Sequence, residues 1–135
     1  MDFRFLGWLS LALAAIATSP YWLRTLNKYT FKTKDPNFLK VIKFLRVIHK
    51  PAGAALAVIA LIHGFLALSG QIRLHTGLMT YISIVLTALL GLRHHFSKKK
   101  DARIFKAHRI MALISVAFLL VHLIRPWLLM ELFGV

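Results

Sequence analysis

Four long apolar stretches constrain this chain more than any other feature. They cover about residues 5–23, 50–69, 76–92 and 106–124, and each approaches the roughly 20 residues that a helix needs to cross about 30 Å of hydrocarbon. Of the 135 residues, 59% are apolar and only four are acids, so this much apolar surface needs lipid or other helices as its surroundings. We therefore predict an all-α, four-helix transmembrane bundle, organised as a single membrane domain over residues 1–135.

The first stretch also has features of a cleavable signal peptide. Arg4 precedes an apolar run that ends in small residues. Tyr21, Trp22 and Arg24, however, resemble an interfacial aromatic belt followed by a stop-transfer charge. These features favour a transmembrane span that is not cleaved from the protein.

The basic residues are distributed unequally between the connections. The segment from Arg24 to Lys50 holds eight Lys or Arg and the segment from Arg93 to Arg109 holds seven, against three elsewhere. The positive-inside rule then places both connections in the cytoplasm and both termini outside, for which we expect a prokaryotic cytoplasmic membrane. The net charge of +14 does not indicate nucleic acid, because the bases lie between apolar runs and form no continuous stripe.

The segment from Pro36 to Ile48 alternates apolar pairs with single bases, with a period of three to four residues. Such a pattern predicts an amphipathic helix. We expect an interfacial helix before the second span, or alternatively an inward extension of that span.

Four histidines form a repeated pattern on the second and fourth spans. His49 and His63 are fourteen positions apart, as are His108 and His122. Fourteen steps are close to four helical turns, so each pair shares one helix face and is separated by about 21 Å along the axis. With the two spans parallel, His49 is level with His108 and His63 with His122.

Facing imidazoles at equal depth are the axial ligands that a haem needs from two helices. The chain has no cysteine, which excludes thioether attachment and thiolate metal sites. We therefore predict two non-covalent b-type haems, with the iron ligand pairs His49/His108 and His63/His122. Bonding of these histidines between helices, without any cofactor, is the alternative.

Small and basic residues near the four histidines fit the same hypothesis. Gly53 and Gly64 would make room for a flat ring, although they could equally be ordinary helix-packing positions. The candidate partners of the haem propionates are Lys50, Arg109, Arg125 and Arg73. Snorkelling of these bases toward the interface is the competing interpretation.

The other three histidines have no match at their depth. His75 begins the third span, and His94 and His95 end it. We expect interfacial histidines here, with alternative ligands or proton donors to a quinone as the second interpretation.

The segments HKPAGAALAVIALIHGFLAL (49–68), HTGLMTYISIVLTALLGL (75–92) and AHRIMALISVAFLLVHLI (107–124) resemble the ferric reductase-like transmembrane superfamily and other dihaem cytochromes b. The resemblance covers about residues 40–125. It implies axial ligation by His49, His63, His108 and His122. Because these 135 residues contain no flavin or nicotinamide domain, the electron donor would be a separate protein, a quinol or a neighbouring subunit.

The sequence thus favours transmembrane electron transfer as a subunit of a larger membrane complex, with a redox protein or quinone as partner. Lys98, Lys99, Lys100 and Arg103 could dock an acidic donor, although topology alone also explains them. A cofactor-free membrane anchor is the alternative function. Proton-coupled or cation transport is disfavoured because all four acids lie in loops or near the termini.

Overall fold

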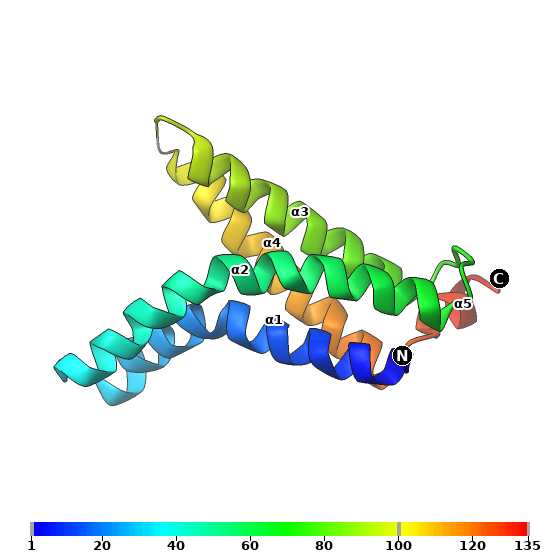
Figure 1. Cartoon of the computed structure of the whole chain (residues 1–135), viewed down its shortest axis with the longest axis horizontal. Helices are drawn as coiled ribbons and strands as arrows, with labels where there is room; N and C mark the ends of the chain where they lie inside the picture. The colour runs from blue at the N-terminus through cyan, green and yellow to red at the C-terminus, as the bar shows by residue number, and fades with distance from the viewer. Residues whose placement is uncertain (1, 100, 135) are drawn as a thin grey trace. The chain divides into compact units, whose positions relative to one another are not determined.

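The computed structural model describes residues 2–99 and 101–134. Over these residues the chain is all-α and contains no strand. The elements are α1 (Phe3–Leu26), the π-helix η1 (Asn27–Phe31), α2 (Pro36–Ala67), α3 (Thr76–Phe96), α4 (Ala102–Ile124) and the short α5 (Leu128–Phe133) (Figure 1). The predicted all-α four-helix bundle is confirmed.

Four helices are long and apolar enough to cross a membrane. They are α1 together with η1, then α2, α3 and α4, and their lengths run from 21 to 32 residues. Each contains most or all of one predicted span. The fold is therefore that of a multi-pass membrane protein, while the orientation of the spans stays a prediction.

Two details differ from the sequence prediction. Residues 36–48 and the second span form one unbroken helix, α2, which agrees with an inward extension; the interfacial position of its first turns stays a prediction. The helix α5 was not predicted, because six residues are too few to give a clear periodic pattern.

The chain divides into two compact parts, Met1–Ile59 and Ala60–Val135. The organisation as a single membrane domain therefore stays a prediction.

In the first part, α1 runs through a proline. Pro20 has no N–H to donate to the carbonyl of Ile16, one helical turn earlier. The hydroxyl of Ser19 donates to that carbonyl instead, at 2.7 Å. The helix therefore continues past Pro20 to Leu26 without an orphaned acceptor at this position.

The turn between α1 and α2 is held by side-chain hydrogen bonds. The amide of Asn27 donates to the carbonyl of Thr33 at 3.1 Å and accepts from the N–H of Thr33 at 2.9 Å. Lys32, between them, has a positive φ of 48°. The carboxylate of Asp35 then accepts from the N–H of Asn37 at 2.9 Å, which satisfies a donor in the first turn of α2.

In the second part, α3 packs closely against α4 through small polar side chains. Thr76, Thr80 and Ser83 of α3 and Ser115 of α4 are all buried. The hydroxyl of Thr87 lies 3.2 Å from that of Ser115 across the two helices. Small and hydroxyl side chains are typical of membrane helix pairs, because they allow close approach and hydrogen bond within a medium that offers no water.

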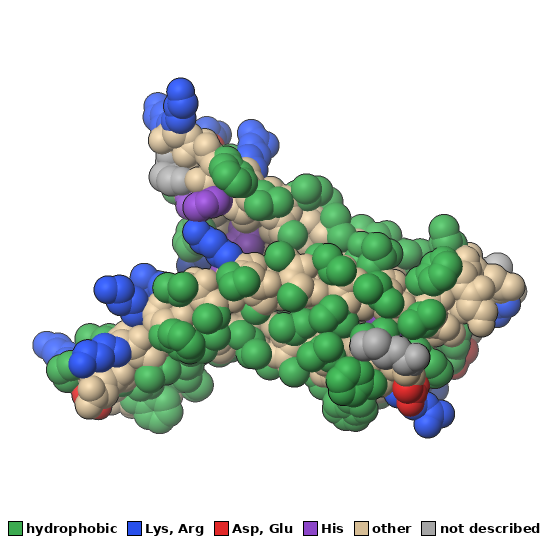
Figure 2. All heavy atoms as spheres, in the orientation of Figure 1, with side chains coloured by type: hydrophobic (Ala, Val, Ile, Leu, Met, Phe, Trp, Pro, Cys, Tyr) green, Lys and Arg blue, Asp and Glu red, His purple; other side chains and the backbone are tan. Residues whose placement is uncertain are grey.

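The outer surfaces of the helices are apolar. The only hydrophobic residues that are buried among the described ones are Leu6, Ile42, Ala52 and Leu56. Large side chains such as Trp8 and Phe65 are exposed. Figure 2 shows hydrophobic side chains along the helices, with Lys and Arg gathered near the η1–α2 turn and the α3–α4 connection. Such a surface suits lipid contact at the middle of each helix and an aqueous or headgroup boundary at these turns.

Candidate functional site

The four histidines of the fourteen-residue pattern are all half-buried. His49 and His63 lie on α2, and His108 and His122 lie on α4. Each residue is therefore partly covered by other parts of the protein, and none is fully exposed to the surroundings of the helices.

In the first part, His49 is bonded to α1. Its Nδ1 lies 2.6 Å from the carbonyl oxygen of Ala17. A carbonyl can only accept, so the imidazole carries its proton on Nδ1 and donates it. A carbonyl oxygen has two lone pairs, so Ala17 can accept from His49 and still take part in its own helix.

In the second part, His108 makes the same type of bond to α3. Its Nδ1 lies 2.9 Å from the carbonyl oxygen of Thr87, to which it donates. The ring also lies against Gly91: a Cβ at that glycine would be only 3.1 Å from the Cε1 of His108. The absence of a side chain at Gly91 is what lets the imidazole approach the backbone of α3.

His122 repeats this arrangement at the other end of the same helix pair. The hydroxyl of Thr76 lies 2.8 Å from the carbonyl of Pro126 and 3.1 Å from the Nδ1 of His122. With its single proton in the shorter of these bonds, the hydroxyl accepts from Nδ1. A Cβ at Gly77 would lie 2.8 Å from the Cε1 of His122. The proton of this imidazole is therefore also on Nδ1.

Three of the four predicted ligands thus share one tautomer. With the proton on Nδ1, the lone pair of a neutral imidazole is on Nε2, which is the atom that would coordinate a metal. A metal-ligating histidine typically donates its other ring N–H to a carbonyl, carboxylate or water, which fixes the ring and raises its basicity. The donor set fits axial haem ligation.

His75 has the opposite tautomer. Its Nδ1 accepts from the N–H of Leu78 at 2.8 Å and so caps the start of α3. The proton of the neutral ring is then on Nε2, where it can only be donated. His75 is buried, with its ring centroid 6.1 Å from that of His122 and 5.7 Å from that of Trp127. Its place is consequently a helix cap and hydrogen-bond donor, not an Nε2 ligand.

The two remaining histidines, His94 and His95, lie in the last turn of α3. The ring of His94 lies against Phe105 of α4, with centroids 5.3 Å apart, and that of His95 against its neighbour Phe96, at 5.0 Å. Both thus take part in aromatic contacts near the α3–α4 connection.

The predicted outer pair lies within one part of the chain. His63 and His122 are within electrostatic range of each other. His49 belongs to the first part and His108 to the second. The inner pair His49/His108 therefore stays a prediction, as does coordination of iron by either pair.

The sequence analysis selected two glycines and missed two others. Apart from the adjacent part of α2 itself, no atom of the described residues lies within 4 Å of a Cβ built at Gly53 or Gly64, so the space beside both glycines is open. The glycines that meet histidines are Gly77 and Gly91. These two are also fourteen residues apart, and this matching period on α3 was the signal that could have identified them.

The predicted propionate partners have varied surroundings. Arg73 donates from Nε to Gln71 at 2.9 Å, and Arg125 lies 3.9 Å from Glu131. The guanidinium of Arg109 lies over the ring of Phe105, at 5.9 Å, and Lys50 is exposed. Of the predicted docking bases, Lys98, Lys99 and Arg103 are exposed, whereas Lys100 lies outside the described residues.

Among residues 2–99 and 101–134, no three His, Asp or Glu side chains converge as they would in an all-protein metal site. Bis-imidazole ligation needs only two protein ligands for each iron. The chain matches no family model, and no curated protein and no solved structure is significantly similar to it.

Proposed function

We propose that this protein is a dihaem cytochrome b that carries electrons across the membrane, as a subunit of a larger redox system. His49 and His108 would hold one haem, and His63 and His122 the other. When bound, the haems would supply one-electron carriers near the two membrane faces. Within this proposal the protein orients the imidazoles and encloses the cofactors in an apolar surrounding.

The observation that carries the proposal is the common Nδ1 bonding of His49, His108 and His122. If these histidines served only as polar links between helices, either ring nitrogen could do so, with either tautomer. Donation from Nδ1 in all three leaves the lone pair on the nitrogen that projects farther from the helix. His75, which lies outside the fourteen-residue pattern, has the other tautomer.

A quinone is the expected small-molecule partner of such a protein, and it belongs to the proposal as an electron donor or acceptor. A cavity of about 220 Å³ at one end of the second part is lined in part by Arg73, Gln71 and Trp127. His75, whose ring contacts that of Trp127, offers a proton on Nε2. Hydrogen-bond donors of this kind are what a quinone carbonyl needs.

A cofactor-free membrane anchor is the second candidate function. The same bonds also suit this function, because His108 and His122 link α4 to α3 through groups of the protein alone. Bonds of this kind contribute about 1 kcal/mol each within membrane proteins. The two functions therefore differ in whether the Nε2 atoms of these histidines coordinate iron.

Absorption spectroscopy of the purified protein tests the proposal. After expression with sufficient haem and reduction with dithionite, we expect b-type bands that correspond to about two haems per chain. His63→Ala and His122→Ala should each remove the same single haem. A cofactor-free protein, or an unchanged haem content in both variants, would reject the proposal.

Asparagine variants separate ligation from helix linking. The side-chain nitrogen of Asn is as many bonds from Cα as the Nδ1 of His, so His108→Asn can keep the bond to the carbonyl of Thr87 while removing Nε2. We expect this variant to lose one haem and to retain most of the stability of the α3–α4 pair. His108→Ala should lose that haem and also part of the stability of the pair. If His108→Asn retains a full haem content, His108 is not an iron ligand and the proposed pair His49/His108 is rejected.

A further inference from the structure

A basic groove lies between α1 with η1 and the first turns of α2, within the first part of the chain. Its volume is about 480 Å³, within the range of about 300–1,000 Å³ that is typical of small-ligand sites. Its lining consists of Arg24, Asn27, Lys28, Leu39, Ile42, Lys43 and Arg46. Four of these seven side chains are cations, and none is an acid.

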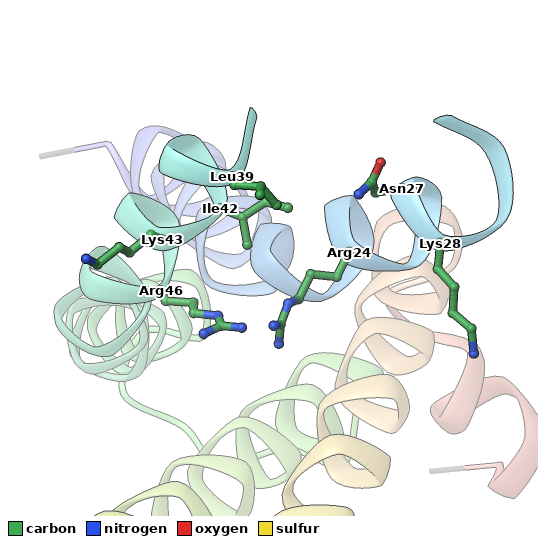
Figure 3. A pocket seen from close by; sticks show the side chains of 7 residues that line it. All are labelled: Arg24, Asn27, Lys28, Leu39, Ile42, Lys43 and Arg46. Atoms are coloured by element: carbon green, nitrogen blue, oxygen red, sulfur yellow. The ribbon is translucent and has the colours of Figure 1, made fainter. Parts of the chain in front are cut away.

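The two arginines face the same space. Figure 3 shows the side chains of Arg24 and Arg46 extending toward one another from α1 and α2, while Lys28 and Lys43 lie at the flanks. Like charges placed in this way repel each other. An anion between them would relieve that repulsion and could accept hydrogen bonds from both guanidinium groups.

No carboxylate of the first part supplies that anion. Its two acids are Asp2 and Asp35, and both carboxylates are used at helix starts, where they accept from backbone N–H groups. The ion pairs among the described residues are Arg103–Asp101 and Arg125–Glu131. The charge of the groove is therefore not balanced by any acid of the first part.

The rest of the groove consists of the amide Asn27 and an apolar wall of Leu39 and Ile42, and it is close to the predicted aromatic belt. Ile42 is 5% exposed and forms a buried wall, whereas Leu39 is 50% exposed. Trp22, two residues before Arg24, is 41% exposed. Tryptophan at such a position is typical of the membrane–water interface, which is the depth at which the phosphates of lipids lie. A site that combines bases with an apolar wall at this depth fits a lipid better than a free anion.

We propose that this groove binds the phosphate headgroup of an anionic phospholipid. The guanidinium groups of Arg24 and Arg46 contact the phosphate. The ammonium groups of Lys28 and Lys43 strengthen the local positive potential. The apolar wall of Leu39 and Ile42 contacts the glycerol and the upper part of the acyl chains. Basic pockets between membrane helices are known to recognise anionic headgroups in this way. The inference does not depend on haem binding.

The test measures the affinity of the purified full chain for phosphatidylglycerol and phosphatidylcholine by native mass spectrometry, with Arg24→Gln/Arg46→Gln as the variant. Each base near an anionic lipid contributes about a fivefold change in affinity, so the double variant should bind phosphatidylglycerol about thirtyfold more weakly. Phosphatidylcholine binding should change by less than about threefold, because this headgroup has no net charge.

A matched control removes the same charge outside the groove. Lys34 and Lys40 are exposed bases of the same part that do not line the groove, so Lys34→Gln/Lys40→Gln should retain most of the preference for phosphatidylglycerol. Arg24→Lys/Arg46→Lys keeps the charge and should stay close to the unmodified protein, which also controls for misfolding. An equal loss in the Arg→Gln variant and the control would overturn the proposal.

A competition measurement identifies the occupant. Inorganic phosphate, added as a competitor, should displace phosphatidylglycerol only weakly; tight binding of phosphate without any lipid preference would overturn the lipid assignment.

Discussion

Gly77→Ala provides a direct test of the contact between α3 and the imidazoles. The new Cβ would lie 2.8 Å from the Cε1 of His122 and 2.9 Å from the Cε1 of His75, whereas carbon atoms pack best at about 3.5–4.0 Å. One or both rings must therefore move by about 0.7 Å or more. Both rings are held by hydrogen bonds through Nδ1, so moving them weakens those bonds.

The size of the effect follows from two opposing contributions. Overpacking of this kind costs about 1–3 kcal/mol, while replacing a helical glycine by alanine stabilises by at most about 1 kcal/mol. We expect Gly77→Ala to lower the free energy of unfolding by about 1–2 kcal/mol. Gly91→Ala should be nearly neutral, because its closest contact, at 3.1 Å from His108, needs a shift of only a few tenths of an ångström.

The assay is unfolding in mixed micelles of rising dodecyl sulfate content, followed by far-ultraviolet circular dichroism on haem-free preparations. Gly53→Ala is the matched control, because its Cβ meets no atom of the described residues within 4 Å and should stabilise α2 slightly. If Gly77→Ala is as stable as Gly53→Ala, the packing of His122 and His75 on α3 is refuted.

Three further variants test the second part. Thr76→Val removes the hydroxyl that links His122 to the turn after α4 and should cost about 1–3 kcal/mol in the same unfolding assay; an unchanged midpoint would contradict this link. Ser115→Ala removes the bond to Thr87 and should cost about 0.6 kcal/mol, up to about 1.7, with Ser115→Thr as the control. Asp101→Ala removes the N-cap of α4 and should cost about 0.5–2 kcal/mol, whereas Asp101→Asn should cost much less.

The fold could be predicted from the sequence because lipid imposes a simple requirement. Backbone N–H and C=O groups that have no water around them must bond within their own segment. An apolar stretch of about 20 residues is therefore expected to form a helix. The helix ends were harder to predict. α1 continues past the predicted end at residue 23 into η1, because the side chain of Asn27 bonds to Thr33 and stabilises the turn. Such a bond between two polar residues of a loop leaves no periodic signal.

The histidines of the candidate site could be selected from the sequence, but their hydrogen bonds to α3 could not be predicted from it. The period of fourteen placed His108 and His122 on one face of α4, and Ser115, midway between them, lies on that face too. The pairing of His108 and His122 with the histidines of α2 stays a prediction, and the sequence analysis did not predict the hydrogen bonds of all three side chains to α3. Side-chain spacing gives the face of a helix, but the neighbour of that face depends on packing, which here includes the close approach of His122 to Gly77 and of His108 to Gly91.

These bonds to α3 do not compete with a ligand on the opposite side of the rings. The two nitrogens of an imidazole point to nearly opposite sides, so an Nδ1 directed at Thr87 or Thr76 turns Nε2 away from α3. A ring that is bonded to a neighbouring helix by one nitrogen also loses its rotational freedom before any ligand arrives, which lowers the entropic cost of coordination. One histidine can therefore link two helices through Nδ1 and still bind iron through Nε2, as proposed above. Because α3 has a glycine opposite each histidine of α4, it holds both rings in an orientation that is compatible with this proposal.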